Sequence, residues 1–93
     1  MRIRVRYFAA LRETMGRDDE TLELGAGADV AAARATLAAR SEAAAAILPR
    51  CVAAVNRAYV AAETPLHEGD ELVFIPPLGG GSETNTGGVE WRH

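Results

Sequence analysis

One short apolar run near the end of the chain limits the folds that this sequence can adopt. The run is Leu72-Val73-Phe74-Ile75, with Glu71 before it and Pro76-Pro77 after it. Four consecutive apolar residues predict a strand that is buried on both faces, or one whose second face is reserved for a partner. Proline cannot donate to a β-ladder, so the strand stops at the two prolines. Such a strand fits a central position in a sheet, with a neighbouring strand on each side.

The length of the chain allows one such sheet with one covering layer. The 93 residues are 48% hydrophobic and 25% charged. A chain of this size buries about 60–65% of the surface that it exposes when unfolded, which supports two packed layers in one domain. We expect residues 1–81 to form that domain. The polar residues 82–93 lack periodicity and are expected to form a flexible extension.

Strand and helix patterns alternate along the first part of the chain. Charged and apolar residues alternate strictly over residues 2–7, which predicts a half-buried strand. Residues 8–15 predict a short helix that ends at Gly16, a residue suited to the left-handed conformation at a helix end. Residues 21–24 predict a second strand, and the short link between the two strands favours antiparallel pairing.

An alanine-rich segment predicts the main helix. Asp29 is a good N-cap, Ser41 is expected to restart the segment as a second short helix, and Pro49 ends it. Its apolar stripe consists of Val30, Ala33, Leu37, Ala44, Ile47 and Leu48. Residues 52–55 and 59–60 then predict a compact hairpin. The order predicts an α+β fold, a mixed sheet with its helix on one face and the first and last strands side by side at its centre.

The charged residues exclude several functions. All ten basic residues are arginine and the net charge is −3. Without lysine, the chain cannot use a lysine nucleophile, a Schiff base or a phosphate-loop lysine. A net negative charge argues against nucleic acid as a partner, because phosphate binding requires clustered positive charge. The basic row of Arg2, Arg4 and Arg6 is interpreted as a solvated strand face.

The remaining reactive side chains predict neither an active site within this chain nor a metal site. Cys51 cannot form an internal disulfide and is interpreted as a buried bystander in a reducing compartment. His67 and His93 are isolated, and the acidic residues within 68–71 are interpreted as a solvated turn. No ligand spacing typical of a metal site is visible. No apolar run could span a membrane and no signal peptide is visible, so we expect a cytoplasmic protein.

The segment after the apolar run has an unusual composition. Pro76-Pro77 forms a stiff extended stretch, and Leu78 and three glycines, Gly79 to Gly81, follow it. Residues without side chains can pass through a narrow channel, because another protein's backbone can approach them closely. The segment is therefore either an arm that presents a glycine carboxylate to an enzyme or a plain linker to a tag or a second domain. The residues alone leave both readings open.

Four motifs in order resemble one family. The chain begins with Arg4-Val5-Arg6-Tyr7-Phe8-Ala9-Ala10-Leu11-Arg12-Glu13. Ala54-Val55-Asn56 follows in the middle, and Pro65-Leu66-His67-Glu68-Gly69-Asp70-Glu71 forms the turn before Pro76-Pro77. With these motifs, residues 1–81 resemble the small subunits of molybdopterin synthase, within the MoaD/ThiS family of ubiquitin-like sulfur carriers.

The resemblance implies a β-grasp (ubiquitin-like) fold and a function without a local active site. In the family, an ATP-dependent adenylyltransferase resembling ubiquitin-activating enzymes adenylates the C-terminal glycine, which then becomes a thiocarboxylate. The carrier inserts this arm into the large synthase subunit, where the active site lies, and donates sulfur to cyclic pyranopterin monophosphate. The resemblance therefore implies Gly80 and Gly81 as the terminal pair and Gly81 as the sulfur-bearing residue. It also implies a heterotetramer with the large subunit and no permanently bound cofactor.

The same resemblance implies a surface for partners. Phe8, Tyr59 and Ile75 map onto a hydrophobic partner face, and Pro76-Pro77 and Leu78 continue it into the arm. The alternative for the first three residues is an ordinary place in the core. Aromatic anchors are common at the centres of interfaces, which favours testing the functional interpretation.

The chain departs from the family pattern at its end. Family members end at the second glycine of the pair, whereas twelve residues, Ser82–His93, follow Gly81 here. With these attached, Gly81 carries an amide and cannot be adenylated. Three explanations remain: a protease trims the chain after Gly81; the tail belongs to a fusion or to cloning; or Gly87-Gly88 is a second processing point. Trimming is the explanation that we place first.

Two other functions remain open at this stage. A related carrier could supply sulfur for thiamine, cysteine or tRNA thiolation, or could act as a protein modifier, because the same C-terminus serves all of these. Without lysine, the chain cannot form lysine-linked chains on itself, which disfavours a chain-forming modifier only. A plain binding module with a glycine-rich linker is the third possibility.

Overall fold

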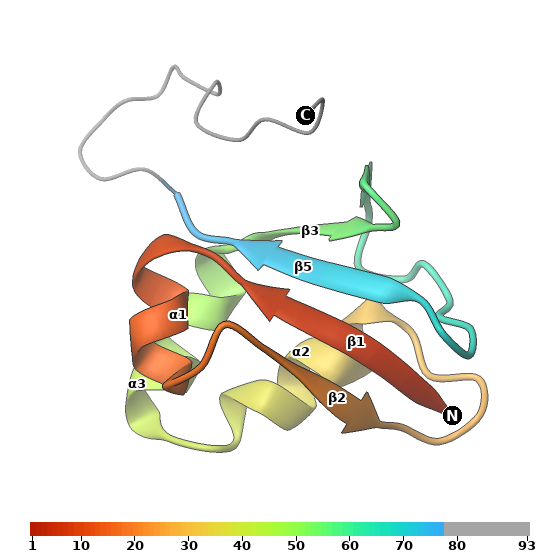
Figure 1. Cartoon of the computed structure of the whole chain (residues 1–93), viewed down its shortest axis with the longest axis horizontal. Coiled ribbons are helices and arrows are strands. Elements are labelled where there is room, and N and C mark those ends of the chain that lie inside the picture. The colour runs from red at the N-terminus through yellow and green to blue at the C-terminus, as the bar shows by residue number, and fades with distance from the viewer. Residues whose placement is uncertain (78–93) are drawn as a thin grey trace.

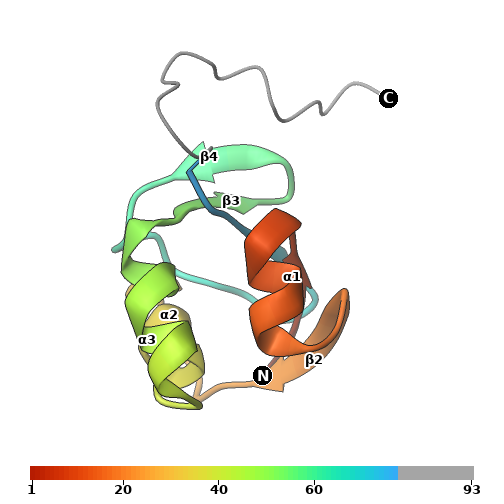
Figure 2. The same ribbon diagram turned by 90° about the vertical axis from the view of Figure 1, so that its left-hand side faces the viewer.

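The computed structural model describes residues 1–77, and its five strands form one mixed sheet (Figure 1). The strand order is β2-β1-β5-β3-β4. The elements are β1 (Arg2–Tyr7), α1 (Ala9–Met15), β2 (Asp19–Glu23), α2 (Val30–Ala38), α3 (Glu42–Ile47), the 3-10 turn η1 (Leu48–Arg50), β3 (Val52–Val55), β4 (Ala58–Val60) and β5 (Glu71–Ile75). The helices pack on one face of the sheet (Figure 2). This is the β-grasp arrangement, and the predicted fold class is confirmed.

The last strand lies at the centre of the sheet, as its apolar sequence predicts. β5 pairs parallel with β1 and antiparallel with β3. Leu72 and Phe74 face the helices and are fully buried. Val73 and Ile75 point to the other face and are also buried, with 1% and 8% of their surfaces exposed. The strand is therefore buried on both faces, and its C-terminal end is where residues 76 and 77 leave the sheet.

The core lies between the sheet and the helices and follows the two sequence periodicities. Ile3, Val5 and Tyr7 of β1 are buried, while the arginines between them are exposed. Five of the six residues of the predicted helical stripe are buried: Val30, Ala33, Leu37, Ala44 and Leu48. The sixth, Ile47, is partly buried and packs against the core. Small alanines at this stripe let the helices lie close to the sheet.

The predicted helix ends at Asp29, Ser41 and Gly16 are confirmed. The first helix begins at Ala9 and not at Phe8, which is extended, and Pro49 lies within η1 after the end of α3. Asp29 accepts a hydrogen bond from the Ala32 amide at 2.9 Å, and Ser41 accepts one from the Ala44 amide at 3.0 Å. Both bonds satisfy amides that have no partner within the first turn of a helix. Gly16 ends α1 with a φ of 79°, in the left-handed region that glycine adopts without strain.

The boundaries of two strands differ from the prediction. β2 begins at Asp19 and ends at Glu23, whereas the predicted strand covers residues 21–24. Asp19 is opposite Arg6 in the ladder, and its carboxylate accepts a hydrogen bond from Arg4. The cross-strand charges thus overcome the turn preference of aspartate. β4 begins at Ala58, one residue before the predicted start.

A network of polar side chains joins β1, β2 and the end of α2 on the helix-covered side. The Tyr7 hydroxyl donates a hydrogen bond to Glu20, and one guanidinium nitrogen of Arg40 contacts both carboxylate oxygens of Glu20, at 3.0 and 2.7 Å. Burial by itself would raise the pKa of Glu20, but the hydrogen bonds from Arg40 and Tyr7 outweigh it and lower the pKa. Burial and the neighbouring Glu20 carboxylate raise the pKa of Tyr7. The sequence does not predict this network, because its members lie far apart in the chain.

Candidate functional site

The face of the sheet that points away from the helices, here called the open face, has two halves. Residues opposite one another across paired strands share a face. On β2, β1 and the beginning of β5, the open face carries charged side chains, which we call the charged half. On β3, β4 and the end of β5 it carries Val52, Ala54, Tyr59, Val73 and Ile75, which we call the apolar half.

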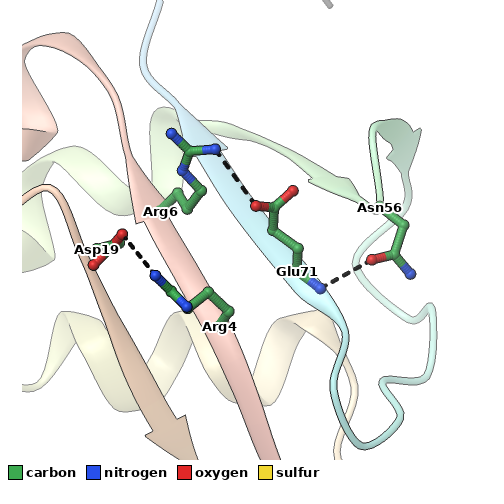
Figure 3. Close-up of polar contacts among 5 residues, drawn as sticks. All are labelled: Arg4, Arg6, Asp19, Asn56 and Glu71. Carbon is green, nitrogen blue, oxygen red and sulfur yellow. Dashed lines mark hydrogen bonds and ion pairs between the residues drawn. The ribbon is translucent and has the colours of Figure 1, made fainter.

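Ion pairs across neighbouring strands neutralise the charged half. Arg4 contacts Asp19 at 3.1 Å and Arg6 contacts Glu71 at 3.5 Å (Figure 3). Arg2 contacts Glu23 at 3.4 Å. The arginine side chains are about half exposed or more, so the predicted solvated strand face is confirmed. Each arginine has an acidic partner, and the row presents little net positive charge to an anion.

The turn before β5 is ordered by its own hydrogen bonds. The Asn56 side-chain oxygen accepts from the Glu71 amide at 3.0 Å (Figure 3), and its amide nitrogen donates to Asp70 at 3.0 Å. Asp70 also accepts from the His67 amide at 2.8 Å. The His67 side chain is 78% exposed and lies 3.8 Å from Asp70. These contacts hold the hairpin against the start of β5. The predicted solvated turn holds for the exposed Glu68, whereas the Asp70 side chain is 15% exposed and accepts structural hydrogen bonds.

The apolar half combines exposed and buried hydrophobic residues. Tyr59 and Val52 are 58% and 52% exposed and are the two large hydrophobic residues exposed within residues 1–77. Val52 is opposite Ile75, and Ala54 lies between Val73 and Tyr59 across the ladder. Ala54, Val73 and Ile75 are buried, although they lie on the side opposite the core. The result is a row of apolar residues beside the end of β5, in which Val52 and Tyr59 supply the exposed apolar surface.

Phe8 extends this surface to β1. Tyr7 is opposite Phe74, and Phe8 continues in an extended conformation, so the register places Phe8 next to Ile75. Tyr7 points into the core, and alternation therefore turns the half-buried Phe8 toward the open face. The next residue, Ala9, has a φ of 53°, which is unusual for a residue other than glycine and turns the chain into α1.

The structure thus brings three predicted site residues to one end of one face. Tyr59 is exposed, Phe8 is half-buried and Ile75 is buried by its neighbours. Their role as a partner surface stays a prediction. Pro76 is buried and Pro77 is exposed where the chain leaves β5. The predicted site residues Leu78, Gly80 and Gly81 lie outside the described residues.

Cys51 is buried near the same end of the sheet. Its surface is 5% exposed and its Sγ lies 3.4 Å from the Ile47 carbonyl oxygen. Burial raises the pKa of the Cys51 thiol to about 11, although the nearby Arg34 and Arg50 act in the opposite direction. The predicted burial of Cys51 is confirmed. Arg34 donates to the Leu48 and Cys51 carbonyls at 2.7 and 2.9 Å and lies over the Phe74 ring.

Within residues 1–77, no group of three or more histidine, cysteine, aspartate or glutamate side chains is placed to hold a metal ion. No helix in that part of the chain is long and apolar enough to cross a membrane.

Comparison with known proteins adds independent information about this chain. The model of the ThiS family matches residues 5–81. The molybdopterin synthase sulfur carrier subunit of Chlamydomonas reinhardtii is 41% identical over 83 residues, which cover 87% of this chain and 100% of that protein.

Solved structures give the same result for the fold. A Pyrococcus furiosus protein assigned as subunit 1 of a molybdopterin converting factor superimposes with a TM-score of 0.77 and 29% identity, covering 84% of this chain and 99% of that one. A chain from a complex of subunits 1 and 2 of the molybdopterin-converting factor of Helicobacter pylori gives a TM-score of 0.65 and 27% identity. It covers 87% of this chain and 100% of its own.

Proposed function

The chain belongs to the ThiS family, and we propose that it is the sulfur carrier subunit of a molybdopterin synthase. The observation that carries this proposal is the end of β5. The central strand delivers the chain to Pro76 and Pro77 next to an apolar surface, and the match to the family continues to residue 81. A carrier needs this combination, because its reactive terminus acts inside another protein.

The chemistry belongs to the glycine terminus and requires no catalytic side chain of this domain. An adenylyltransferase uses ATP to convert the Gly81 carboxylate into an acyl-adenylate, which has a good leaving group. A sulfur donor then replaces AMP and leaves a thiocarboxylate. The thiocarboxylate sulfur is a nucleophile, and holding it in the partner's active site supplies proximity that free sulfide lacks. Gly80 and Gly81 carry no side chains that would obstruct a narrow channel.

The apolar half of the open face is the surface that we assign to the large synthase subunit. The Helicobacter pylori chain is described in a complex of subunits 1 and 2, which supports a partner of this kind. Exposed Val52 is opposite Ile75, where the arm leaves the sheet, and exposed Tyr59 lies on β4 on the same face. A partner that covers them also receives the arm. An aromatic residue surrounded by buried apolar neighbours is typical of an energetically dominant interface position.

The function requires a free carboxylate at Gly81. The family model ends its match at residue 81, and the Chlamydomonas reinhardtii protein is covered completely by 87% of this chain. Both support a carrier domain of residues 1–81. We propose that a protease removes residues 82–93 before activation in the cytoplasm.

The test is the mass of the product after activation. The chain is truncated after Gly81, which keeps every described element because these lie within residues 1–77. It is then incubated with an adenylyltransferase, ATP and a sulfur donor. We expect the mass to rise by the difference between sulfur and oxygen. The full chain and a Gly81→Ala variant serve as controls and should gain much less sulfur. An unchanged mass of the truncated chain would contradict the proposal.

A second measurement identifies the acceptor. The thiocarboxylated chain is mixed with the large subunit and cyclic pyranopterin monophosphate, and molybdopterin is measured. Molybdopterin formation that depends on the large subunit supports the proposed role. Sulfur uptake without molybdopterin formation would point instead to a carrier for another thiolation.

A further inference from the structure

A carrier with an activated terminal carboxyl can acylate its own side chains. The carbon of an acyl-adenylate is attacked by amines: a C–N bond forms, AMP leaves and the amine loses a proton, which gives a stable amide. A thiolate gives a thioester by the same route. Groups on the same chain react fastest, because the arm holds them at a high effective concentration. The nucleophiles near the point where the arm leaves the sheet therefore matter for a carrier.

Arginine occupies positions near this point where the geometry does not require it. Arg6 makes a single long contact of 3.5 Å with Glu71 and its side chain is 48% exposed. Arg50 is exposed and lies two residues before Val52, which is opposite Ile75. Lysine could supply the same charge at both positions, whereas guanidinium stays protonated and is a poor nucleophile.

Two other arginines occupy positions where their contacts favour a guanidinium group. Arg34 spans two carbonyls and the Phe74 ring, and Arg40 contacts both oxygens of Glu20. Such geometry favours the planar guanidinium over an ammonium group. The absence of lysine at every one of the ten basic positions therefore goes beyond what these contacts explain.

Cys51, the single thiol of the chain, is also inaccessible to the arm. Cys51 immediately precedes Val52 and thus lies near the end of β5, yet its surface is 5% exposed. Burial keeps the thiol protonated, since its pKa is about 11. A protonated, covered thiol is a poor nucleophile.

The other nitrogen nucleophiles of the described residues lie at the opposite end of the sheet. β1 runs parallel to β5, so Met1 lies near the beginning of β5, and its amine donates to the Leu24 carbonyl at 2.7 Å. His67 precedes β5 and faces Asp70. A reach of about 20 Å is the upper limit for the six residues after Ile75 when fully extended. By the register, Met1 is opposite residue 68, seven positions or about 23 Å before Ile75, which is beyond this limit.

We infer, on the basis of the proposed sulfur carrier function, that this domain keeps its activated terminus from acylating the domain itself. Arginine in place of lysine and the burial of Cys51 remove nucleophiles from the surroundings of the arm. The activated terminus then reacts with sulfur supplied by a donor. A single amine near the exit of the arm is therefore expected to create a side reaction, the formation of an internal amide.

Arginine-to-lysine variants in the chain of residues 1–81 test this inference. Arg6→Lys and Arg50→Lys place an amine near the exit, and Arg2→Lys places one on the same strand and face as Arg6 but at its far end. Each variant is incubated at low protein concentration with adenylyltransferase and ATP, without a sulfur donor. Pyrophosphate release reports activation, and intact mass reports the loss of one water per chain that an internal amide produces.

We expect the internal amide in Arg6→Lys and Arg50→Lys, and at least about tenfold less in Arg2→Lys and in the unchanged chain, because proximity governs the rate. Peptide mapping should place the amide between Gly81 and the new lysine. Pyrophosphate release without amide in both near variants would overturn this inference and leave the carrier function standing. Equal amide in Arg2→Lys and Arg6→Lys would also overturn it. A truncated chain that releases no pyrophosphate would overturn the proposed function and this inference with it.

Discussion

The two faces of the central sheet differ although the same strands make both of them. On the covered face, Leu72 and Phe74 of β5 are fully buried by helices of the chain itself, and the charged Glu20 has three polar partners. On the open face, the charged half is neutralised by ion pairs, whereas the apolar half leaves Tyr59 and Val52 more than half exposed.

The difference separates residues that serve folding from residues that serve binding. Most hydrophobic side chains on the covered face are buried within the described chain, so they contribute to stability. The apolar half of the open face gains most of its remaining burial only when another surface covers it. Substitutions on the two faces should therefore affect different measurements.

The largest effect on stability is expected from Phe74→Ala on the covered face. The ring is fully buried and packs under Arg34, and its removal leaves a cavity. The free energy of unfolding should fall by about 3–5 kcal/mol, measured by urea denaturation. Val52→Ala on the open face serves as the control and should cost less than about 1 kcal/mol. Equal losses would contradict the division between the faces.

The next effect concerns binding rather than stability. Tyr59→Asp places a charge at the exposed aromatic position of the apolar half, on strand β4, where a docked partner would exclude water. Affinity for the large synthase subunit should fall by about 30-fold or more, corresponding to about 2 kcal/mol, measured by titration calorimetry. Unfolding should change little, because Tyr59 is 58% exposed. Glu23→Gln in the charged half is the matched control; a similar loss of affinity there would remove the distinction between the halves.

A smaller effect that depends on pH is expected from Glu20→Gln on the covered face. The pKa of Glu20 lies below its ordinary value of 4.5, so its network stabilises the fold above that pH. The variant should lose about 1–3 kcal/mol near neutral pH. The difference from the unchanged chain should shrink as pH falls through the lowered pKa, in urea denaturation at several pH values. A difference that does not change with pH would exclude the charge as its cause.

The smallest effect is expected from Arg4→Ala in the charged half. Its ion pair with Asp19 is 3.1 Å long but exposed to solvent. Solvent and salt screen such pairs, and the loss of stability should be at most about 1 kcal/mol and should decrease in high salt. Denaturation at low and high salt measures it. A loss comparable to that of Phe74→Ala would show that the charged half supports the fold as strongly as the core does.

Much of this fold could be predicted because its signals are local. Alternation in β1, the N-caps Asp29 and Ser41, and the apolar run of β5 each depend on a few neighbouring residues. The start of β2 at Asp19 was not predictable in this way, because Arg4 and Arg6 of another strand decide it. The network around Glu20 escaped prediction for the same reason.

The sequence by itself determined the elements, the core stripe, the family to which the chain belongs and the composition without lysine. These follow from periodicity, from caps and prolines, and from motifs that can be read along the chain. Only the tertiary structure decided that Phe8, Ile75 and Tyr59 lie on one face beside the exit of the arm, and that Cys51 is near this exit but covered. Strand register and burial depend on segments that are distant in the chain, which is the physical reason why neither could be read from the local pattern.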